Sequence, residues 1–352
     1  MNNQPGQTQY TNNSTLRTII HIFQFLSSRK HIQKDKAVIH PFRVIVRKEI
    51  SDHVKSWRFI ILIGIIALTC LGSMYTALTN MGNAVKSTDP EGAFFFLKLY
   101  TITDGTLPSY LVFISFLGPL LGIGLGFDAV NSEQNRGTLS RILSQPIHRD
   151  YLINAKFVAA LTVISVMLFA LGLLVMGLGL VIMGVPLTAE EFLRIICFIM
   201  LSILYVAFWL NLSILFSVRF RQPATSAMAG IAVWLFFTVF YPLIVKMVVK
   251  AVTPSSVMIT RHQAINVETL RLTLMRILPN HLFQEATNTL LIPSVRSLGP
   301  LTMEQLYGTI PGPLPLGQSI LLVWPQVTGL IAATVLCFLL SYVWFMRREI
   351  RS

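Results

Sequence analysis

Long apolar runs dominate the pattern of hydrophobic and polar positions along this chain. Six of them approach the roughly 20 residues that a helix needs to cross a hydrocarbon core about 30 Å thick. They cover Phe59–Leu78, Tyr110–Phe127, Phe157–Val185, Ile195–Val218, Ala224–Val245 and Ile320–Met346. None contains Asp, Glu, Lys or Arg, and one charge at the centre of a span costs about 2.5–3.5 kcal/mol. The pattern predicts an all-α integral membrane protein with six transmembrane helices, the first five within residues 58–245 and the sixth at 320–346.

A basic amphipathic segment precedes the first run. Pro41 is well placed for a first helical turn, and apolar and polar residues then alternate with helical spacing. The apolar face holds Phe42, Ile45, Val46, Ile50, Val54 and Trp57, and the polar face Arg43, Arg47, Lys48, Ser51 and Lys55. We expect an interfacial connecting helix within residues 37–57, after a partly disordered cytoplasmic extension over residues 1–36. A basic anchor without a mechanical task is the alternative.

The segment between the fifth and sixth runs, residues 246–319, predicts a small extracytoplasmic cap. Apolar residues at helical spacing indicate one helix that ends at Pro279 and a second, short helix that ends before Pro293. The Pro311–Pro315 stretch then favours an extended connection into the last span.

The distribution of basic residues predicts the orientation in the membrane. The segment before Phe59 carries ten Lys and Arg residues, and cytoplasmic flanks are enriched in these residues. We therefore expect a cytoplasmic N-terminus and, after six spans, a cytoplasmic tail at residues 347–352. The first apolar run starts too far from Met1 for a cleavable signal peptide, so the expected location is the cell membrane.

Composition supports this class and narrows the partners. Hydrophobic residues make up 53% of 352 positions and charged residues 12%, about half the usual share of a soluble domain. The net charge of +13 comes from residues clustered beside apolar runs, which favours anionic membrane lipids over nucleic acid. The three cysteines lie within apolar runs and indicate no disulfide framework.

Motifs for catalysis are absent from the sequence. It contains no G-x-x-x-x-G-K-[ST] loop, no H-E-x-x-H and no C-x-x-C, so we expect a non-catalytic chain without a cofactor or metal of its own. His262 and His281, with Glu268 or Glu285, have no spacing that fixes a metal site. Asn211 and Gln326 are candidate path-lining residues, although hydrogen bonds between helices are the commoner role for such side chains.

The loop between the second and third runs holds a short apolar stripe. Leu139, Ile142 and Leu143 recur at i, i+3 and i+4, after Gly137-Thr138 and before Ser144-Gln145-Pro146. The pattern predicts a short amphipathic helix parallel to the membrane. Such a stripe suits insertion into a groove of a cytosolic partner, and an ordinary surface helix is the alternative.

This loop resembles the corresponding segment of ABC type-2 exporter permeases. The resemblance is carried by Glu133-x-x-x-Gly137-Thr138-Leu139, then Leu143-Ser144-x-Pro146-x-x-Arg149, and Lys156. It implies a coupling helix at about 133–147 that docks on a cytosolic ABC ATPase. The residues implied in coupling are Glu133, Arg136, Gly137, Thr138, Leu139, Ile142, Leu143, Ser144, Pro146 and Arg149.

The resemblance further implies the partners and the function. ATP and Mg²⁺ would bind on two ATPase subunits, and a second permease copy, identical or not, would complete an export path. An extracytoplasmic accessory protein would be a further partner of the cap. Two alternatives remain open, namely an ABC-derived anchor that transmits force to an outer machine and, disfavoured by the uncharged spans, an ion-coupled secondary transporter.

Overall fold

The computed structural model describes most of the chain, and the described residues form helices and no strand. The described ranges are 40–84, 94–103, 107–144, 148–184, 186–253, 261–294 and 313–347. The chain divides into two units, residues 1–44 and 45–352. Helix α2 (Pro41–Val54) begins in the first unit and ends in the second, and the contacts described below belong to residues 45–352.

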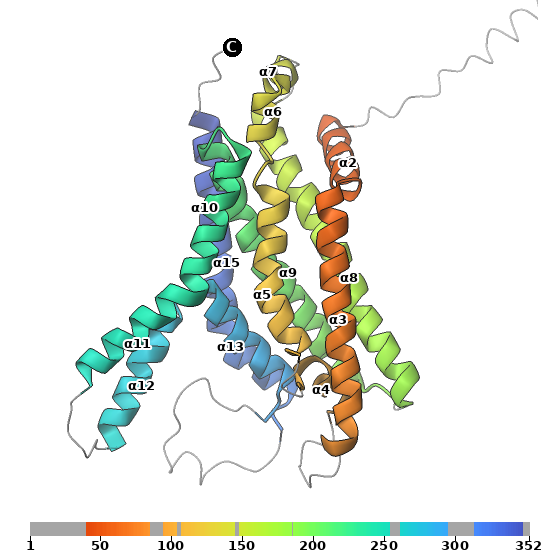
Figure 1. Ribbon diagram of the computed structural model, residues 1–352, viewed down its shortest axis with the longest axis vertical. Coiled ribbons are helices and arrows are strands. Elements are labelled where there is room, and N and C mark those ends of the chain that lie inside the picture. The colour runs from red at the N-terminus through yellow and green to blue at the C-terminus, as the bar shows by residue number, and fades with distance from the viewer. Residues whose placement is uncertain are drawn as a thin grey trace, which may run out of the picture. The chain divides into compact units, whose positions relative to one another are not determined.

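Six helices are long and apolar enough to cross a membrane, which confirms the prediction of six spans (Figure 1). They are α3 (Trp57–Ala84), the span that begins with α5 (Tyr110–Gly126) and runs on to Asn135, α8 (Arg149–Met183), α9 (Ala189–Arg219), the continuous α10–η2–α11 (Pro223–Val252) and α15 (Leu316–Arg347). Helices α8 and α9 begin several residues before the predicted apolar runs, because their first turns contain polar residues. Thr188 and Glu191 form a capping box at the start of α9, which satisfies otherwise unpaired backbone N–H groups.

Shorter helices connect the spans. Helix α4 (Phe95–Thr101) precedes α5, α6 (Asn131–Asn135) and α7 (Thr138–Leu143) follow it, and α12 (Arg261–Met275) and α13 (Pro279–Leu291) precede α15. Helix α4 escaped the sequence analysis because seven residues are too few to span a bilayer. Its Phe96, Leu97, Leu99 and Tyr100 are nevertheless fully buried, and the Tyr100 hydroxyl donates to the carbonyl of Gly172 in α8 over 2.8 Å.

Helix α9 is the central element of the bundle. It contacts α5, α8, α10, α13 and α15. In its most apolar stretch of 18 residues, 67% is buried inside the chain, against 17% for the corresponding stretch of the α10–η2–α11 span. The close contact with α5 depends on glycine. A Cβ atom on Gly122 would lie 2.8 Å from both the Leu210 nitrogen and the Val206 oxygen of α9. Small residues at such spacing let two membrane helices approach until their backbones touch.

The fifth span contains a π-helical turn. Residues Phe236–Phe240 form η2, and the N–H of Tyr241 donates to the carbonyl of Phe236, five residues earlier. This single wider turn places one extra residue between α10 and α11. Thr238 in this turn accepts a hydrogen bond from the Asn280 amide of α13 over 3.0 Å.

Helix α13 packs against the spans rather than standing apart from them. It contacts α15, α9, α5 and α4, and its Phe283 ring stacks on Tyr205 of α9 at 4.3 Å between centroids. The Tyr205 hydroxyl lies 2.8 Å from the Asn280 Oδ1 atom and 2.9 Å from the Ser115 carbonyl oxygen. The predicted cap falls partly outside the described residues, at 254–260 and 295–312, and its extracytoplasmic location stays a prediction.

A buried arginine joins these elements at the end of the spans near α4. Arg194 of α9 is fully buried and pairs with Glu190 at 2.9 Å. Its guanidinium also donates to the carbonyls of Leu290 and Leu314 and lies over the Phe94 ring. One cation therefore holds the end of α13 and the start of α15 against α9.

We expect Gly122→Ala to lower the melting temperature of the detergent-solubilised protein by several degrees, because the new methyl group forces α5 away from the α9 backbone. Gly64→Ala is the matched control, since a Cβ atom there meets nothing within 4 Å and alanine favours helix by up to about 1 kcal/mol. Equal melting temperatures for the two variants would contradict the close α5–α9 contact.

Candidate functional site

A buried lysine between two carboxylates forms the centre of the candidate site. Lys156 of α8 is 5% exposed, and its Nζ atom lies 3.0 Å from Glu49 Oε2 of α2 and 2.9 Å from Glu133 Oε1 of α6. Lys48 Nζ approaches the same two acids, at 3.2 Å from Glu49 Oε1 and 3.9 Å from Glu133 Oε1. Three segments far apart in the sequence are thus joined by one ammonium group.

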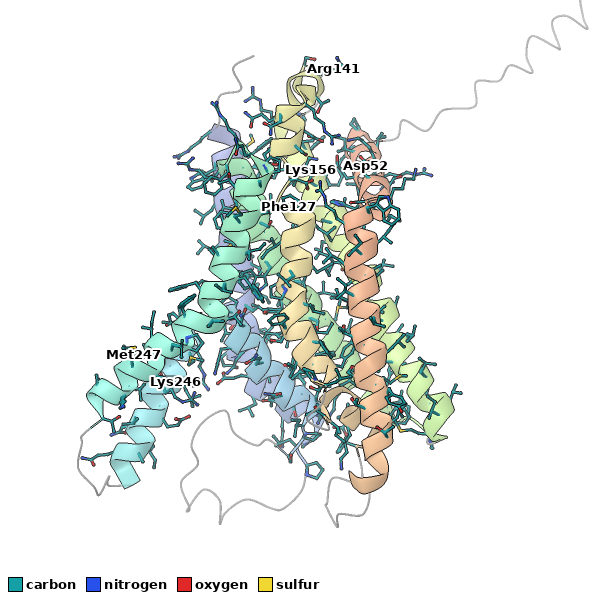
Figure 2. The ribbon with its side chains drawn as sticks, in the orientation of Figure 1. Asp52, Phe127, Arg141, Lys156, Lys246 and Met247 are labelled. Carbon is teal, nitrogen blue, oxygen red and sulfur yellow. The ribbon has the colours of Figure 1, made fainter. Side chains whose placement is uncertain are left out.

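Local structure brings these charges together. Lys156 lies two turns after the start of α8 at Arg149, just before the uncharged part of that span. Glu49 is the buried residue of α2, on the flank of that helix's apolar face, where Ile45 and Ile50 pack against the core. Figure 2 shows Lys156 at the same end of the spans as Asp52 and Arg141, with Lys246 and Met247 toward the other end.

The electrostatics of Glu49 favour its charged form. Burial alone raises the pKa of this carboxyl, but attraction and hydrogen bonding from Lys156 and Lys48 outweigh burial, and the net pKa is lower than usual. A buried ion pair of this kind contributes through its geometry, and removing one partner leaves an uncompensated buried charge. The cluster therefore holds α2, α6 and α8 together only while Glu49, Glu133 and Lys156 are all charged.

Contacts beside this cluster connect the residues that follow α5 to two other spans, α3 and α9. Arg58 at the start of α3 pairs with Asp128 after α5 and lies over the Phe127 ring. The Ser217 hydroxyl of α9 accepts hydrogen bonds from the backbone N–H groups of Val130 and Asn131, at 2.9 and 3.2 Å. A cavity of ≈ 660 Å³ opens beside the cluster, between α2, α3, α5, α6, α7 and α8.

The residues expected to act in coupling lie in α6, α7 and the turn between them. Gly137 has φ +68, a left-handed conformation that glycine adopts without strain, and the Thr138 hydroxyl donates to the Glu133 carbonyl over 3.1 Å. Arg136, Arg141, Ser144 and Arg149 are exposed. Pro146 and the side chains of Ile142 and Leu143 lie outside the described residues.

Leu139 differs from its expected environment. It is 4% exposed and belongs to the core cluster of the chain, so the side chain that the stripe assigned to a partner's groove packs within this chain. Asn211 and Gln326 are also buried. The Asn211 amide donates to the Thr334 carbonyl at 3.4 Å and the Gln326 amide to Glu285 at 3.1 Å, and their place on a path stays a prediction.

The histidines and acids considered for a metal have other contacts. Glu268 pairs with Arg271 at 2.6 Å, and Glu285 pairs with Arg276 at 3.0 Å. His281 Nδ1 lies 3.7 Å from Glu285, and the His262 side chain is outside the described residues. Among described residues, no three His, Cys, Asp or Glu side chains are grouped to hold an ion.

Comparison with known proteins identifies the family. The sequence profile of the ABC-2 family transporter proteins matches residues 43–350. This chain belongs to the ABC-2 family. A related sequence, the probable ABC transporter permease protein NosY of Pseudomonas aeruginosa, is 25% identical over 204 residues, which cover 56% of this chain and 67% of the relative.

Family membership settles the broad class of this ABC-2 protein. It is an integral membrane protein and the membrane subunit of an ABC transporter, a class of subunit that works with ABC ATPases and is normally non-catalytic. Sequence analysis missed Glu49 and Ser217 as site residues. The signal for Glu49 was an acid on the apolar flank of a basic helix, where a charge needs a buried partner.

We expect Lys156→Gln to destabilise the ABC-2 permease by about 3 kcal/mol, because the buried Glu49 and the partly buried Glu133 then keep only the exposed Lys48 as a cation. The triple variant Glu49→Gln, Glu133→Gln and Lys156→Gln should recover most of this loss, since no unpaired charge remains. Chemical denaturation in detergent measures both, with exposed Lys55→Gln as the control. A triple variant no more stable than the single one would rule out the charge argument.

The lowered pKa of Glu49 predicts a pH dependence. A carboxyl whose pKa is lower in the folded protein stabilises it fully above the unfolded value, about 4.3, and this contribution is lost as pH falls through the folded value. The stability difference between the wild-type protein and Glu49→Gln should therefore be constant from pH 7 to 5 and shrink below about pH 4. A difference that did not shrink at all between pH 5 and the lowest pH at which the protein stays folded would contradict the ion pair.

Proposed function

We propose that this ABC-2 permease forms an export path and that ATP hydrolysis on partner subunits drives it through the segment from Glu133 to Pro146. The observation that carries the proposal is the buried Lys156, which ties that segment to α8 and α2 at once. ATP and Mg²⁺ belong to two cytosolic ABC ATPase subunits in this proposal, and a second permease copy completes the path.

The segment has one side chain buried in this chain and two arginines exposed to a partner. Leu139 anchors α7 in the chain's own core, while Arg136 and Arg141 remain exposed on the same short segment. We therefore assign contact with the ATPase to these exposed arginines, with Ile142 and Leu143 as the apolar part of the coupling helix. This assignment replaces a groove-filling role for Leu139 with an anchoring role.

Two rigid links carry a displacement of α7 into the membrane. The Glu133–Lys156 pair leads to α8 and, through Glu49, to α2. The bonds from Val130 and Asn131 to Ser217 lead to α9, the helix that most other spans contact. Hydrogen-bonded charge pairs have short, directional geometry, so the segment and these helices move together rather than independently.

The orientation rests on the positive-inside rule. Helix α3 begins, and α9 and α15 end, at the same end of the bundle as α7 (Figure 1). This end therefore carries Arg58, Arg136, Arg141, Arg219 and Arg347, and short cytoplasmic loops are enriched in such residues. We place this end, with both termini, on the cytoplasmic side of the cell membrane. Helix α2 then acts as the interfacial connecting helix, and outward transport follows the exporters that the loop resembles.

The test is co-purification with an ABC ATPase from the native membrane. We expect Arg136→Glu combined with Arg141→Glu to abolish co-elution, because it reverses two charges on the proposed contact, whereas Lys246→Glu combined with Lys250→Glu at the other end should not. The neutral triple variant at residues 49, 133 and 156 should retain the ATPase but reduce the permease-dependent change in its hydrolysis rate at least tenfold.

Two results would reject this assignment. Unchanged co-elution of the Arg136→Glu, Arg141→Glu variant would remove the contact from α7. Full coupling in the neutral triple variant would remove Lys156 from the route of transmission, even if the contact itself were confirmed.

A further inference from the structure

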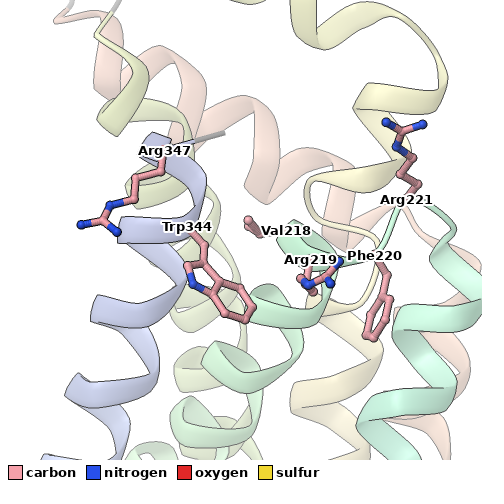
Figure 3. Close-up of a pocket in the computed structure, with 6 residues that line it drawn as sticks. All are labelled: Val218, Arg219, Phe220, Arg221, Trp344 and Arg347. Carbon is pink, nitrogen blue, oxygen red and sulfur yellow. The ribbon is translucent and has the colours of Figure 1, made fainter. Parts of the chain in front are cut away.

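A second cavity lies where three spans reach the same end of the bundle. It measures ≈ 520 Å³ and is lined by Val218, Arg219, Phe220, Arg221, Trp344 and Arg347 (Figure 3). Arg219 is the last residue of α9 and Arg347 the last of α15, and Arg221 stands two residues before α10. The position of all three arginines at the ends of spans indicates the level of the lipid headgroups.

The cavity is strongly cationic. None of its lining residues is acidic, and in the described part of the chain no carboxylate pairs with Arg219, Arg221 or Arg347. The C-terminal ends of α9 and α15 contribute roughly −0.5 charge each and the N-terminal end of α10 roughly +0.5, which leaves a charge of about +2.5. This excess of positive charge on exposed arginines favours an anionic ligand over a neutral one.

The walls of the same cavity are apolar. Figure 3 shows Trp344 and Phe220 on opposite sides, with Val218 and Arg219 between them. Val218 is buried, whereas Trp344 is 45% exposed. Helix α9 contacts both α10 and α15, and each of these two helices exposes large apolar side chains, among them Met228 and Leu340.

We propose that this cavity binds an anionic phospholipid. Its phosphate lies beside Arg219, at the level of the exposed Arg221 and Arg347, and an acyl chain runs between Phe220 and Trp344 toward the hydrocarbon layer (Figure 3). Basic pockets between transmembrane helices bind lipid headgroups in this way, and tryptophan favours the interface between headgroup and hydrocarbon. A soluble phosphate would use the arginines but not the apolar walls, so a lipid accounts for both. The site does not depend on the direction of transport or on ATPase coupling.

Native mass spectrometry of the delipidated full chain tests the site by titration with phosphatidylglycerol and with phosphatidylcholine of the same acyl chains. We expect one phosphatidylglycerol to bind with clear preference. Arg219→Gln, Arg221→Gln and Arg347→Gln together should weaken it about 100-fold, at about fivefold per basic residue. Lys55→Gln, Lys246→Gln and Lys250→Gln remove the same charge elsewhere and should leave the affinity unchanged.

Trp344→Ala separates a lipid from a simple anion, because it should weaken phosphatidylglycerol without changing the binding of glycerol phosphate. Melting temperatures in a zwitterionic detergent confirm that each variant is folded. Equal affinity for the two lipids, an unchanged affinity in the arginine variant, or displacement by equimolar glycerol phosphate would overturn the proposal. A change of oligomeric state in the arginine variant would instead assign the cavity to a protein interface.

Discussion

The arrangement of this ABC-2 permease at one membrane surface depends on a single buried ammonium group. Lys156 stands at the point where α8 passes from polar to uncharged residues, and only the carboxylates of Glu49 and Glu133 make its burial tolerable. The helix before the first span and the loop after the second are held by that need for neutralisation. The mechanical link we propose is thus a consequence of electrostatics at the edge of a low-dielectric layer.

Elsewhere the bundle is held by close helix packing and by a small number of buried polar contacts. Helix α9 approaches α5 until the backbones touch at Gly122, and it holds α13 through the stacked pair of Tyr205 and Phe283. The buried Arg194 closes the other end with a carboxylate and two carbonyls. The central helix is therefore fixed at three levels, and the fifth and sixth spans expose most of their apolar surface.

Uncharged length and local motifs made part of this fold predictable from the sequence. The six spans were predictable because a charge within a span is costly, and the helix start at Pro41 because proline suits a first turn. The seven-residue α4 was not predictable, because its burial depends on α8 and α9. Glu49 was missed because its role exists only opposite Lys156, which is 107 residues away. The apolar stripe at Leu139 was predicted from its helical spacing. That spacing does not show whether the stripe packs within this chain or against a partner.

The π-helical turn of the fifth span has a consequence for how relatives of this protein can diverge. Residues Phe236–Phe240 hold one residue more than a regular turn, and each residue rotates a helix by about 100°. Deleting one residue there restores regular α-helix and keeps the hydrogen bonds of both halves, whereas a deletion elsewhere in the span turns every later side chain away from its neighbour. This segment is the place where the fifth span can change length by one residue without losing its helical backbone.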